Sequence, residues 1–354
     1  MGQTNVIMKR SQAVLSLLLA VLQLFLIGCG IRDANGPSDR ETASSVISPE
    51  ETAAPLPTEE DTTVPAEETD VTAPEESETA QGKTPAASLL SSCEPFGTIG
   101  MTNLADAKIR EKLSALEATL LATDTAVFYE SLSDHAVFAF RAEQPFRCQS
   151  TIKAPYCLSV MRMLGSMEAL ESREICLSEE QITPGFGPTS LFPPGTLFSP
   201  AELICNTIRD SDNTAYRMLF DTYGKEAFNL FSDSCGSGCR LVGDRFCSCS
   251  VSDMAALFRA IYEDNTAMGP ILLEHMENTS AAFLTNAALP EYRIAHKYGL
   301  DDEMGDCHDC AIVYDDVPFL LVIFSHYDPA SSSPFASFRS IARTCAEIHE
   351  SIYS

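Results

Sequence analysis

The chain has 354 residues and a formal net charge of −27 at pH 7. An acidic chain with no basic tract offers no surface for neutralising phosphates, so its charge excludes nucleic acid as a partner. The length would allow two ordinary domains, but the first quarter differs so much in composition from the rest that we expect a single large folded domain.

The first 29 residues have the pattern of a secretory signal peptide. Two basic residues precede an apolar run over residues 13–27, which ends in small residues before Cys29. The sequence Leu-Ile-Gly-Cys that ends at Cys29 resembles a bacterial lipobox, which implies that this cysteine becomes the acylated N-terminus of the mature chain. We therefore expect an extracytoplasmic protein that is anchored to the cell membrane by lipid. The alternative is an uncleaved signal anchor, for which the run is short and is interrupted by Gln23.

Residues 30–92 are dominated by Thr, Pro, Glu, Ala and Ser and carry many of the acidic side chains. Such a segment cannot bury enough apolar area to offset the entropy lost on ordering, so we expect a disordered linker. The folded domain is then residues 93–354.

Strand patterns lie toward both ends of this domain, each beside a terminal helix, and helical patterns fill its middle. Apolar residues at three- and four-residue steps predict a helix over residues 103–121, and an amphipathic pattern predicts a second helix over residues 336–352. Between them, residues 151–273 read as mostly helical, with a break at the Pro-Gly-Phe-Gly-Pro stretch of residues 184–188. Five segments rich in β-branched and aromatic residues predict strands: 126–129, 137–140, 294–298, 310–314 and 319–325.

Strands at both ends of a helical middle imply an α+β fold. We expect a five-stranded antiparallel sheet flanked by the terminal helices, beside an all-helical lobe. A site would lie in the crevice between the sheet and this lobe.

Ser150 and Lys153 stand one helical turn apart, directly after the second predicted strand. A serine hydroxyl needs an adjacent base to take its proton as it attacks a carbonyl, and a lysine buried beside another cation loses its own proton readily. The tetrapeptide alone would also fit an ordinary helix start.

Two further short motifs accompany this pair. Ser211-Asp212-Asn213 follows 61 residues after Ser150, and Lys297-Tyr298-Gly299 follows 86 residues after Ser211. They add a hydroxyl that can relay a proton, an amide that can hold a substrate amide, and a fixed cation.

Together the three motifs resemble the Ser-x-x-Lys, Ser-Asp-Asn and Lys-Thr-Gly set of class A β-lactamases and penicillin-binding proteins, over about residues 96–354. The resemblance implies that Ser150 is the acylated nucleophile and that its backbone N–H forms the oxyanion hole with the N–H of Leu300, which follows Gly299. Lys153 would be the general base or its partner, and Ser211 would pass a proton to the leaving nitrogen.

The remaining roles follow from the same resemblance. Asn213 would bind substrate and hydrogen-bond Lys153, Lys297 would raise the local positive potential, and Asp212 would order its own loop. Tyr298 stands where the family has Thr or Ser, whose hydroxyl helps to hold the substrate carboxylate. A phenol on a strand places its oxygen further out, so we expect a differently shaped substrate.

The second departure from the family concerns deacylation. Class A β-lactamases activate the hydrolytic water with a Glu in a Glu-x-x-Leu-Asn stretch, which is missing here. The loop at that place is short, and the only carboxylate in its second half is Asp244, which also fits a turn residue after Gly243. The sequence therefore contains the residues that acylation needs, but lacks the glutamate that activates water for deacylation.

Twelve cysteines remain besides Cys29. The family resemblance implies a disulfide between Cys157 and Cys205, although Cys205 is offset by one position. Cysteines 235, 239, 247 and 249, together with the pair at 307 and 310, favour disulfides or free thiols over zinc, because their spacing does not match paired Cys-x-x-Cys knuckles. We expect no metal and no cofactor, and structural roles for His296 and His308.

The first functional hypothesis is an exported serine hydrolase of the class A β-lactamase family that forms an acyl-enzyme on Ser150 with β-lactams and hydrolyses them, with slow turnover allowed. The alternative is a D,D-peptidase, penicillin-binding protein or esterase that acts on D-alanyl peptides of the cell wall. A third hypothesis, from another class, is a non-catalytic surface lipoprotein that binds or senses. Nothing in the sequence calls for an oligomer, and we expect a monomer.

Overall fold

The computed structural model describes residues 96–99, 106–328 and 334–354. All of them belong to one compact unit of the chain. The predicted signal peptide, the lipidation site Cys29 and the linker at residues 30–92 lie outside the described residues. Of the helices that the structure describes, none is both long enough and apolar enough to cross a membrane.

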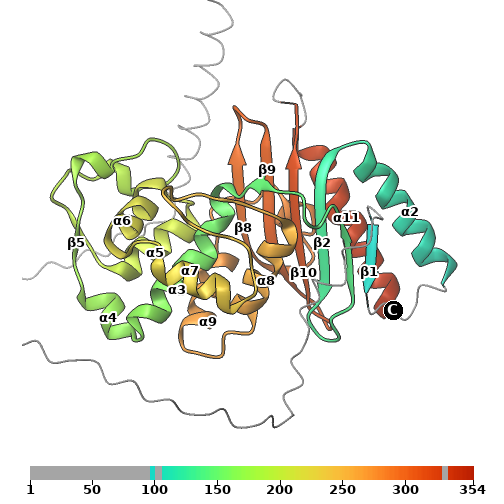
Figure 1. Ribbon diagram of the computed structural model, residues 1–354, viewed down its shortest axis with the longest axis horizontal. Helices are drawn as coiled ribbons and strands as arrows, with labels where there is room; N and C mark the ends of the chain where they lie inside the picture. Colours follow the sequence, from blue (N-terminus) through green and yellow to red (C-terminus); the bar gives the residue numbers. More distant parts are fainter. Residues whose placement is uncertain (1–95, 100–105, 329–333) are drawn as a thin grey trace, which may run out of the picture. The chain divides into compact units, whose positions relative to one another are not determined.

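The centre of the unit is a six-stranded antiparallel sheet (Figure 1). Its strands run in the order β1-β3-β2-β10-β9-β8, so the two ends of the domain meet where β2 pairs with β10. The strands are β1 (Phe96–Ile99), β2 (Asp124–Ser131), β3 (Val137–Phe140), β8 (Arg293–Asp301), β9 (Asp306–Tyr314) and β10 (Phe319–His326).

The α+β architecture and the antiparallel sheet were predicted, and five of the strands are the predicted ones. The count of five was wrong by one, because β1 adds a sixth strand at the edge beside β3. β1 was not predicted because its four residues include Gly97, a residue type disfavoured in strands, whereas the equally short β3 is an uninterrupted apolar run.

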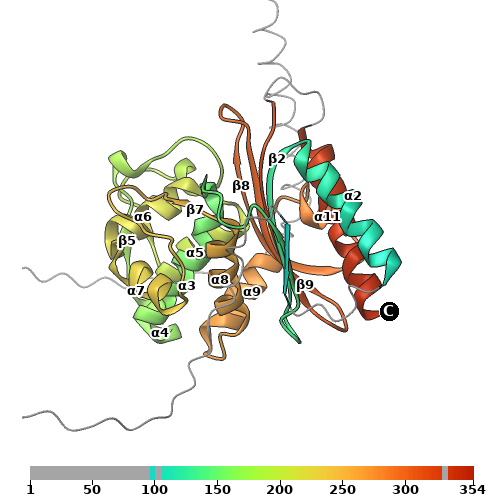
Figure 2. The ribbon, with the colours of Figure 1, turned by 45° about the vertical axis from the view of Figure 1, so that its right-hand side comes forward.

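Two long helices cover one face of the sheet, α2 (Ala107–Leu121) and α11 (Pro334–Tyr353), and lie side by side (Figure 2). Asp106 starts α2, because its side chain accepts a hydrogen bond from the Lys108 N–H at 2.7 Å. The four apolar residues that predicted this helix, Ile109, Leu113, Leu116 and Leu120, are all buried.

The other face of the sheet packs on the helical lobe, mainly through α8. The lobe holds α3 (Lys153–Leu164), α4 (Met167–Ser172), α5 (Pro200–Arg209), α6 (Asn213–Tyr223), α7 (Glu226–Ser234), α8 (Val251–Tyr262) and α9 (Met268–Glu277). A short helix, α10 (Thr285–Ala288), leads into β8. Two small sheets tie the loops together: β4 (Phe146–Arg147) with β7 (Ser248–Cys249), and β5 (Ile175–Cys176) with β6 (Leu197–Phe198).

Two apolar cores lie on the two faces of the sheet. On β10, Leu320, Val322 and Phe324 belong to the core shared with the helical lobe, whereas the alternate residues belong to the core under α2 and α11. A strand buried on both faces reads as a continuous apolar run, and β10 does so.

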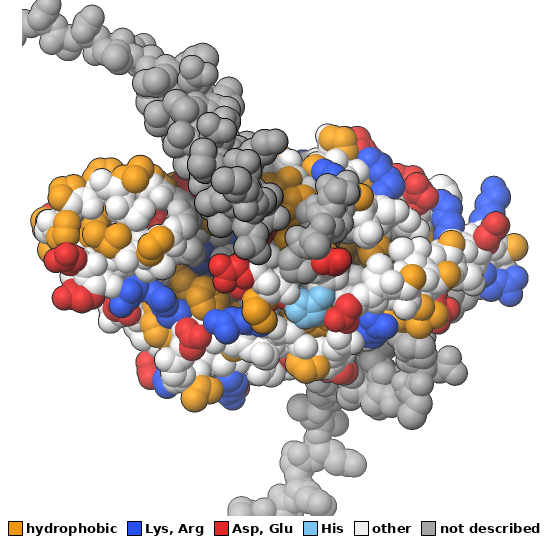
Figure 3. All heavy atoms as spheres, turned by 90° about the horizontal axis from the view of Figure 1, so that it is seen from above, with side chains coloured by type: hydrophobic (Ala, Val, Ile, Leu, Met, Phe, Trp, Pro, Cys, Tyr) orange, Lys and Arg blue, Asp and Glu red, His pale blue; other side chains and the backbone are white. Residues whose placement is uncertain are grey.

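The face of the molecule seen from above carries basic side chains scattered among acidic, apolar and uncharged ones (Figure 3). Among the described residues, several arginines form ion pairs, including Arg259 with Glu130 and Arg162 with Asp264.

Candidate active site

Ser150 lies on a strained turn between β4 and α3. The turn is a 3₁₀ helix over Gln149–Ile152, and Gln149 has a φ of 45°, a conformation that costs a non-glycine residue energy. Two hydrogen bonds hold the turn: Gln149 Nε2 donates to Asp306 Oδ2 and Thr151 Oγ1 donates to the Cys148 carbonyl, each at 2.5 Å. The Ser150 side chain is half-buried and makes no hydrogen bond to the residues that the structure describes.

Lys153, one turn further, is completely buried. Its Nζ donates to the Ser211 carbonyl at 2.6 Å and to Asn213 Oδ1 at 2.8 Å, and Ser211 Oγ lies at 3.4 Å. Burial, followed by the nearby charge of Lys297, holds the pKa of Lys153 well below its usual value. A neutral amine has two N–H groups, so the two short bonds leave its lone pair available for a proton.

The Ser211–Asn213 motif joins α5 to α6. Ser211 is buried with a φ of 54°, and Asp212 caps α6 by accepting from the Ala215 N–H at 2.8 Å. The other oxygen of Asp212 accepts from the Thr189 N–H at 2.7 Å. These are the contacts of a residue that orders its loop.

The Pro-Gly-Phe-Gly-Pro stretch packs directly on this motif. A Cβ on Gly185 would lie 2.8 Å from Asn213 Nδ2, and one on Gly187 would lie 2.2 Å from the Asp212 side chain. Both glycines have positive φ, and the Phe186 carbonyl accepts from the Asn213 N–H at 3.1 Å. The sequence showed this stretch only as a helix break, but it positions Asn213.

Lys297 reaches the same serine from the sheet. It is fully buried on β8, and its Nζ donates to Ser211 Oγ at 2.9 Å. Burial lowers the pKa of Lys297 to about 7. Ser211 Oγ therefore lies between two lysines, one from the helical lobe and one from the sheet.

Gly299 allows β8 to touch the nucleophile turn. A Cβ there would lie 2.8 Å from Gln149 Cβ and 2.9 Å from the Ser150 backbone nitrogen. Only glycine permits this approach, which brings the Ser150 N–H next to the strand that carries Leu300.

Tyr298 does not project beyond its strand. It is 2 % exposed, packs edge-on against Phe283 with the ring centroids 5.1 Å apart, and its ring centroid lies 4.1 Å from Lys297 Nζ. Burial raises the pKa of Tyr298 to about 12, while a hydrogen bond with the Ser211 side chain acts in the opposite direction. The phenol thus fills space beside the lysine instead of extending outwards as the sequence had led us to expect.

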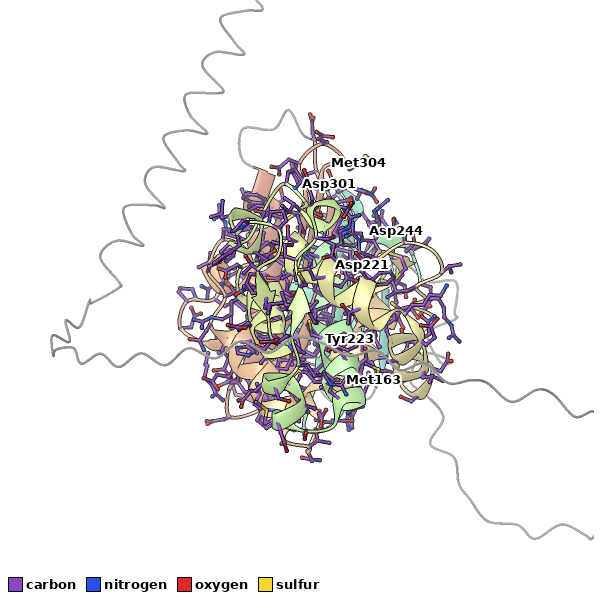
Figure 4. All side chains as sticks on the ribbon, turned by 90° about the vertical axis from the view of Figure 1, so that its left-hand side faces the viewer. Met163, Asp221, Tyr223, Asp244, Asp301 and Met304 are labelled. Atoms are coloured by element: carbon purple, nitrogen blue, oxygen red, sulfur yellow. The ribbon has the colours of Figure 1, made fainter. Side chains whose placement is uncertain are left out.

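The loop between α7 and α8 brings no carboxylate to Lys153. Asp244 has a side chain that is 58 % exposed, pairs with Arg147 at 3.3 Å, and lies toward the rim of the helical lobe (Figure 4). The next residue, Arg245, is held by its carbonyl, which accepts from Tyr216 Oη at 2.6 Å. Its Nη1 is buried without a hydrogen-bond partner among the described residues, and its charge helps to lower the pKa of Lys153.

The implied disulfide between Cys157 and Cys205 is absent from the structure, because both are free thiols. Cys205 lines an apolar pocket of about 320 Å³ together with Met161, which lies one turn beyond Cys157 on α3. Cys205, which is offset by one position, thus lies near the turn of α3 that carries Met161 and not near the turn that carries Cys157. None of the predicted catalytic side chains lines this pocket.

The two histidines beside the motifs are buried in polar contacts. His296 Nδ1 lies 2.9 Å from Asp309 Oδ1, and His308 Nε2 lies 3.0 Å from the Arg147 carbonyl. Within the described ranges, no group of three or more His, Cys, Asp or Glu side chains is arranged to hold a metal ion.

Two buried lysines thus meet at Ser211, one turn of helix and one strand away from the turn that carries Ser150. The model of the "Beta-lactamase enzyme family" matches residues 108–349, well over half of the chain. The chain belongs to this family of serine hydrolases. No curated protein sequence matches it.

Solved structures share the fold. "Structure of PBP-A" has a TM-score of 0.61 at 19 % identity, covering 67 % of this chain and 96 % of that one. A substituted form of PBP-A, titled as an acyl-enzyme complex with penicillin G, has a TM-score of 0.61 at 18 % identity and covers 68 % of this chain and 97 % of that one. A class A β-lactamase from Mycobacterium abscessus has the same TM-score and identity, and covers 68 % of this chain and 99 % of that one.

The structure thus joins Lys153, Ser211, Asn213 and Lys297 by hydrogen bonds, as the sequence had singled them out. Ser150 lies one turn before Lys153, with its backbone nitrogen beside Gly299. The sequence reasoning missed the residues that position them, chiefly Gln149, Asp306, the two glycines of residues 184–188 and Arg245. A glycine pair between prolines was the only visible signal among these.

Proposed function

We propose that the protein reacts with β-lactams to form an acyl-enzyme on Ser150, and that the acyl group is released slowly. Lys153 takes the Ser150 proton as the hydroxyl attacks the lactam carbonyl, and the backbone N–H groups of Ser150 and Leu300 receive the developing oxyanion. The proton returns to the leaving nitrogen through Ser211, with Lys297 beside it.

The observation that carries this proposal is the pair of lysines on Ser211. Two ammonium groups buried this close cannot both keep their protons cheaply, so the site favours one neutral amine, which is the state that a general base needs.

Slow release is inferred from the α7–α8 loop. Its carboxylate, Asp244, pairs with Arg147 at the surface, and the residue whose charge acts on Lys153 is the cation Arg245. A guanidinium cannot take a proton from water, so the loop supplies no base for deacylation.

The test uses two β-lactams on the purified chain. A fluorescent penicillin should label it in a band that persists on a denaturing gel, and a chromogenic cephalosporin should change colour slowly. Ser150→Ala should abolish both signals, while Ser133→Ala, in the exposed β2–β3 turn, should change neither. Labelling that survives Ser150→Ala would contradict the proposal.

A D,D-peptidase of cell-wall peptides is the second candidate, and the lack of a carboxylate base in the α7–α8 loop favours it, because penicillin-binding proteins keep a long-lived acyl group when they react with β-lactams. The enclosed phenol of Tyr298 affects both substrates alike, because each carries the carboxylate that the family's Thr or Ser hydroxyl helps to hold. Release of D-alanine from a D-alanyl-D-alanine peptide, dependent on Ser150, would identify this activity. A chain that neither takes the penicillin label nor cleaves peptide or ester substrates would contradict both candidates for those substrates and favour the non-catalytic surface lipoprotein.

We also propose that the protein is exported and held to the cell membrane by acylation of Cys29. The support is the signal-like sequence that ends at this cysteine. Incorporation of labelled palmitate should require Cys29. In the Cys29→Ala variant, the protein should be found in the soluble fraction or as the unprocessed precursor instead of as a mature membrane-bound form. Unchanged labelling would refute the anchor.

A further inference from the structure

Two cysteines face each other immediately before the nucleophile turn. β4 and β7 pair Arg147 with Ser248, and Cys148 and Cys247 lie one residue beyond this pair, just past the ends of the two strands. The Cys148 N–H donates to the Cys247 carbonyl at 2.9 Å, and the Cys247 N–H donates to Cys148 Sγ at 3.4 Å. The two sulfur atoms are 3.9 Å apart.

Opposite residues of an antiparallel pair have Cα atoms about 4.5–5.5 Å apart, which is within the range that disulfides span. A small rotation of each side chain would therefore bring the two sulfurs together without moving the strands. Cys148 is fully buried and Cys247 is half-buried, so only one of the two thiols is open to a reagent.

Two more thiols, those of Cys239 and Cys249, adjoin this pair and are buried. Side-chain hydrogen bonds connect Cys247 to Cys148, Cys239 and Cys249, and together they lower the pKa of Cys247. Four thiols could suggest zinc, but the described residues contain no group arranged to hold a metal ion. The contact between strand neighbours favours a covalent bond instead.

We propose that Cys148 and Cys247 form a disulfide that ties the nucleophile turn to the α7–α8 loop. Formation of the disulfide does not depend on the proposed function. The effect of the disulfide on acylation rests on the proposed function. Cys148 stands two residues before Ser150, and its carbonyl accepts from Thr151 Oγ1, so a constraint on Cys148 acts directly on the turn.

The bond forms by thiol–disulfide exchange with a low-molecular-weight or protein disulfide. The Cys247 thiolate attacks one sulfur of the oxidant, forming a mixed disulfide and releasing one thiolate. Cys148, after losing its proton to solvent, attacks Cys247 Sγ and releases the second thiolate. The oxidant gains two electrons and becomes two thiols, and the protein loses two hydrogens.

The test is peptide mapping of the purified full-length chain after equilibration with graded ratios of oxidised to reduced glutathione. Free thiols are trapped by alkylation, and zinc is measured in the same samples. We expect a peptide that joins Cys148 to Cys247, at a ratio where Cys176, an exposed cysteine on β5, remains a free thiol. Cys247→Ser should abolish the crosslink, and Cys176→Ser should leave it.

Two further measurements connect the bond to stability and to the site. A crosslink between residues 99 positions apart should raise the melting temperature of the oxidised chain above that of the reduced chain by about 5–15 °C. Penicillin labelling should be several-fold faster in the oxidised chain, and Cys247→Ser should label at the reduced rate under both conditions.

Each outcome decides one part of the proposal. Thiols that alkylate at every ratio, a crosslink that excludes either member of the pair, or stoichiometric zinc at the four cysteines would overturn the bond. A crosslink without any change in labelling rate would overturn its link to the nucleophile turn. Absence of labelling in both states would contradict the proposed function, while the peptide map would still decide the bond.

Discussion

Gly299→Ala tests whether contact between β8 and the nucleophile turn sets the rate of acylation. The added Cβ would lie 2.8 Å from Gln149 Cβ and 2.9 Å from the Ser150 nitrogen. A Cβ added to Gly243 would have no atom within 4 Å. Ordinary carbon contacts are about 3.5–4.0 Å, so β8 or the turn must shift by roughly 0.7–1 Å.

Overpacking of this kind costs about 1–3 kcal/mol, which lowers the melting temperature of a domain of this size by about 2–10 °C. A displacement of about 1 Å at reacting groups can cost ~100-fold in rate, so we expect penicillin labelling to slow by about that factor. The rate is measured by gel fluorescence over time, and stability by thermal unfolding.

Gly243→Ala, in the α7–α8 loop, is the matched control and should change neither quantity. If Gly299→Ala labels within about threefold of the wild-type rate, the contact between β8 and the turn does not position Ser150, and the reasoning fails.

Three other substitutions test the electrostatics and the loops. The pKa of Lys297 is about 7 in the folded chain and about 10.4 in the unfolded chain. Between these pH values the lysine is mostly neutral in the folded chain and mostly protonated in the unfolded chain. The unfolded state then binds the extra proton, so this group makes the free energy of unfolding rise with pH between these values, by at most about 1.4 kcal/mol per pH unit. The difference between wild type and Lys297→Met in urea unfolding should therefore vary across this window, and a constant difference would count against a depressed pKa. Asp212→Ala removes the cap of α6 and leaves the Thr189 N–H without its acceptor, which should cost about 1–3 kcal/mol, while Asp316→Ala, in the exposed β9–β10 turn, should cost less than about 0.5 kcal/mol. Arg245→Glu places a carboxylate near Lys153 and should shorten the lifetime of the penicilloyl-enzyme, whereas Arg245→Gln should not; equal lifetimes in a chase experiment would show that the loop does not limit release.

The strands and helices that pack against each other were largely readable from the sequence. β10 is a continuous apolar run because both of its faces are buried, and α2 shows its buried stripe at helical spacing. β1 was missed because Gly97 interrupts its four residues and the strand forms at the sheet edge by pairing with β3.

The site residues likewise divide into those related by local sequence and those that meet only in the tertiary structure. Ser150 and Lys153 are one turn apart on contiguous chain, so their proximity follows from local geometry. Their meeting with Ser211 and Lys297 was expected only through the three-motif resemblance, because no local rule relates positions on the helical lobe to an edge strand.

The sequence by itself determined the fold class, the order of the elements and the residue types that carry the chemistry, because hydrophobic period and short motifs are local properties. Only the tertiary structure decided the pKa values of the two lysines and how Tyr298 and Cys205 pack. The pKa values of Lys153 and Lys297 are lowered because both side chains are buried, and for Lys153 also because the charge of Lys297 is near. Tyr298 turns inward because Phe283 covers it, and Cys205 lies beside Met161 because of helix register. Each of these depends on which surfaces meet, and that information lies in contacts between residues far apart along the chain.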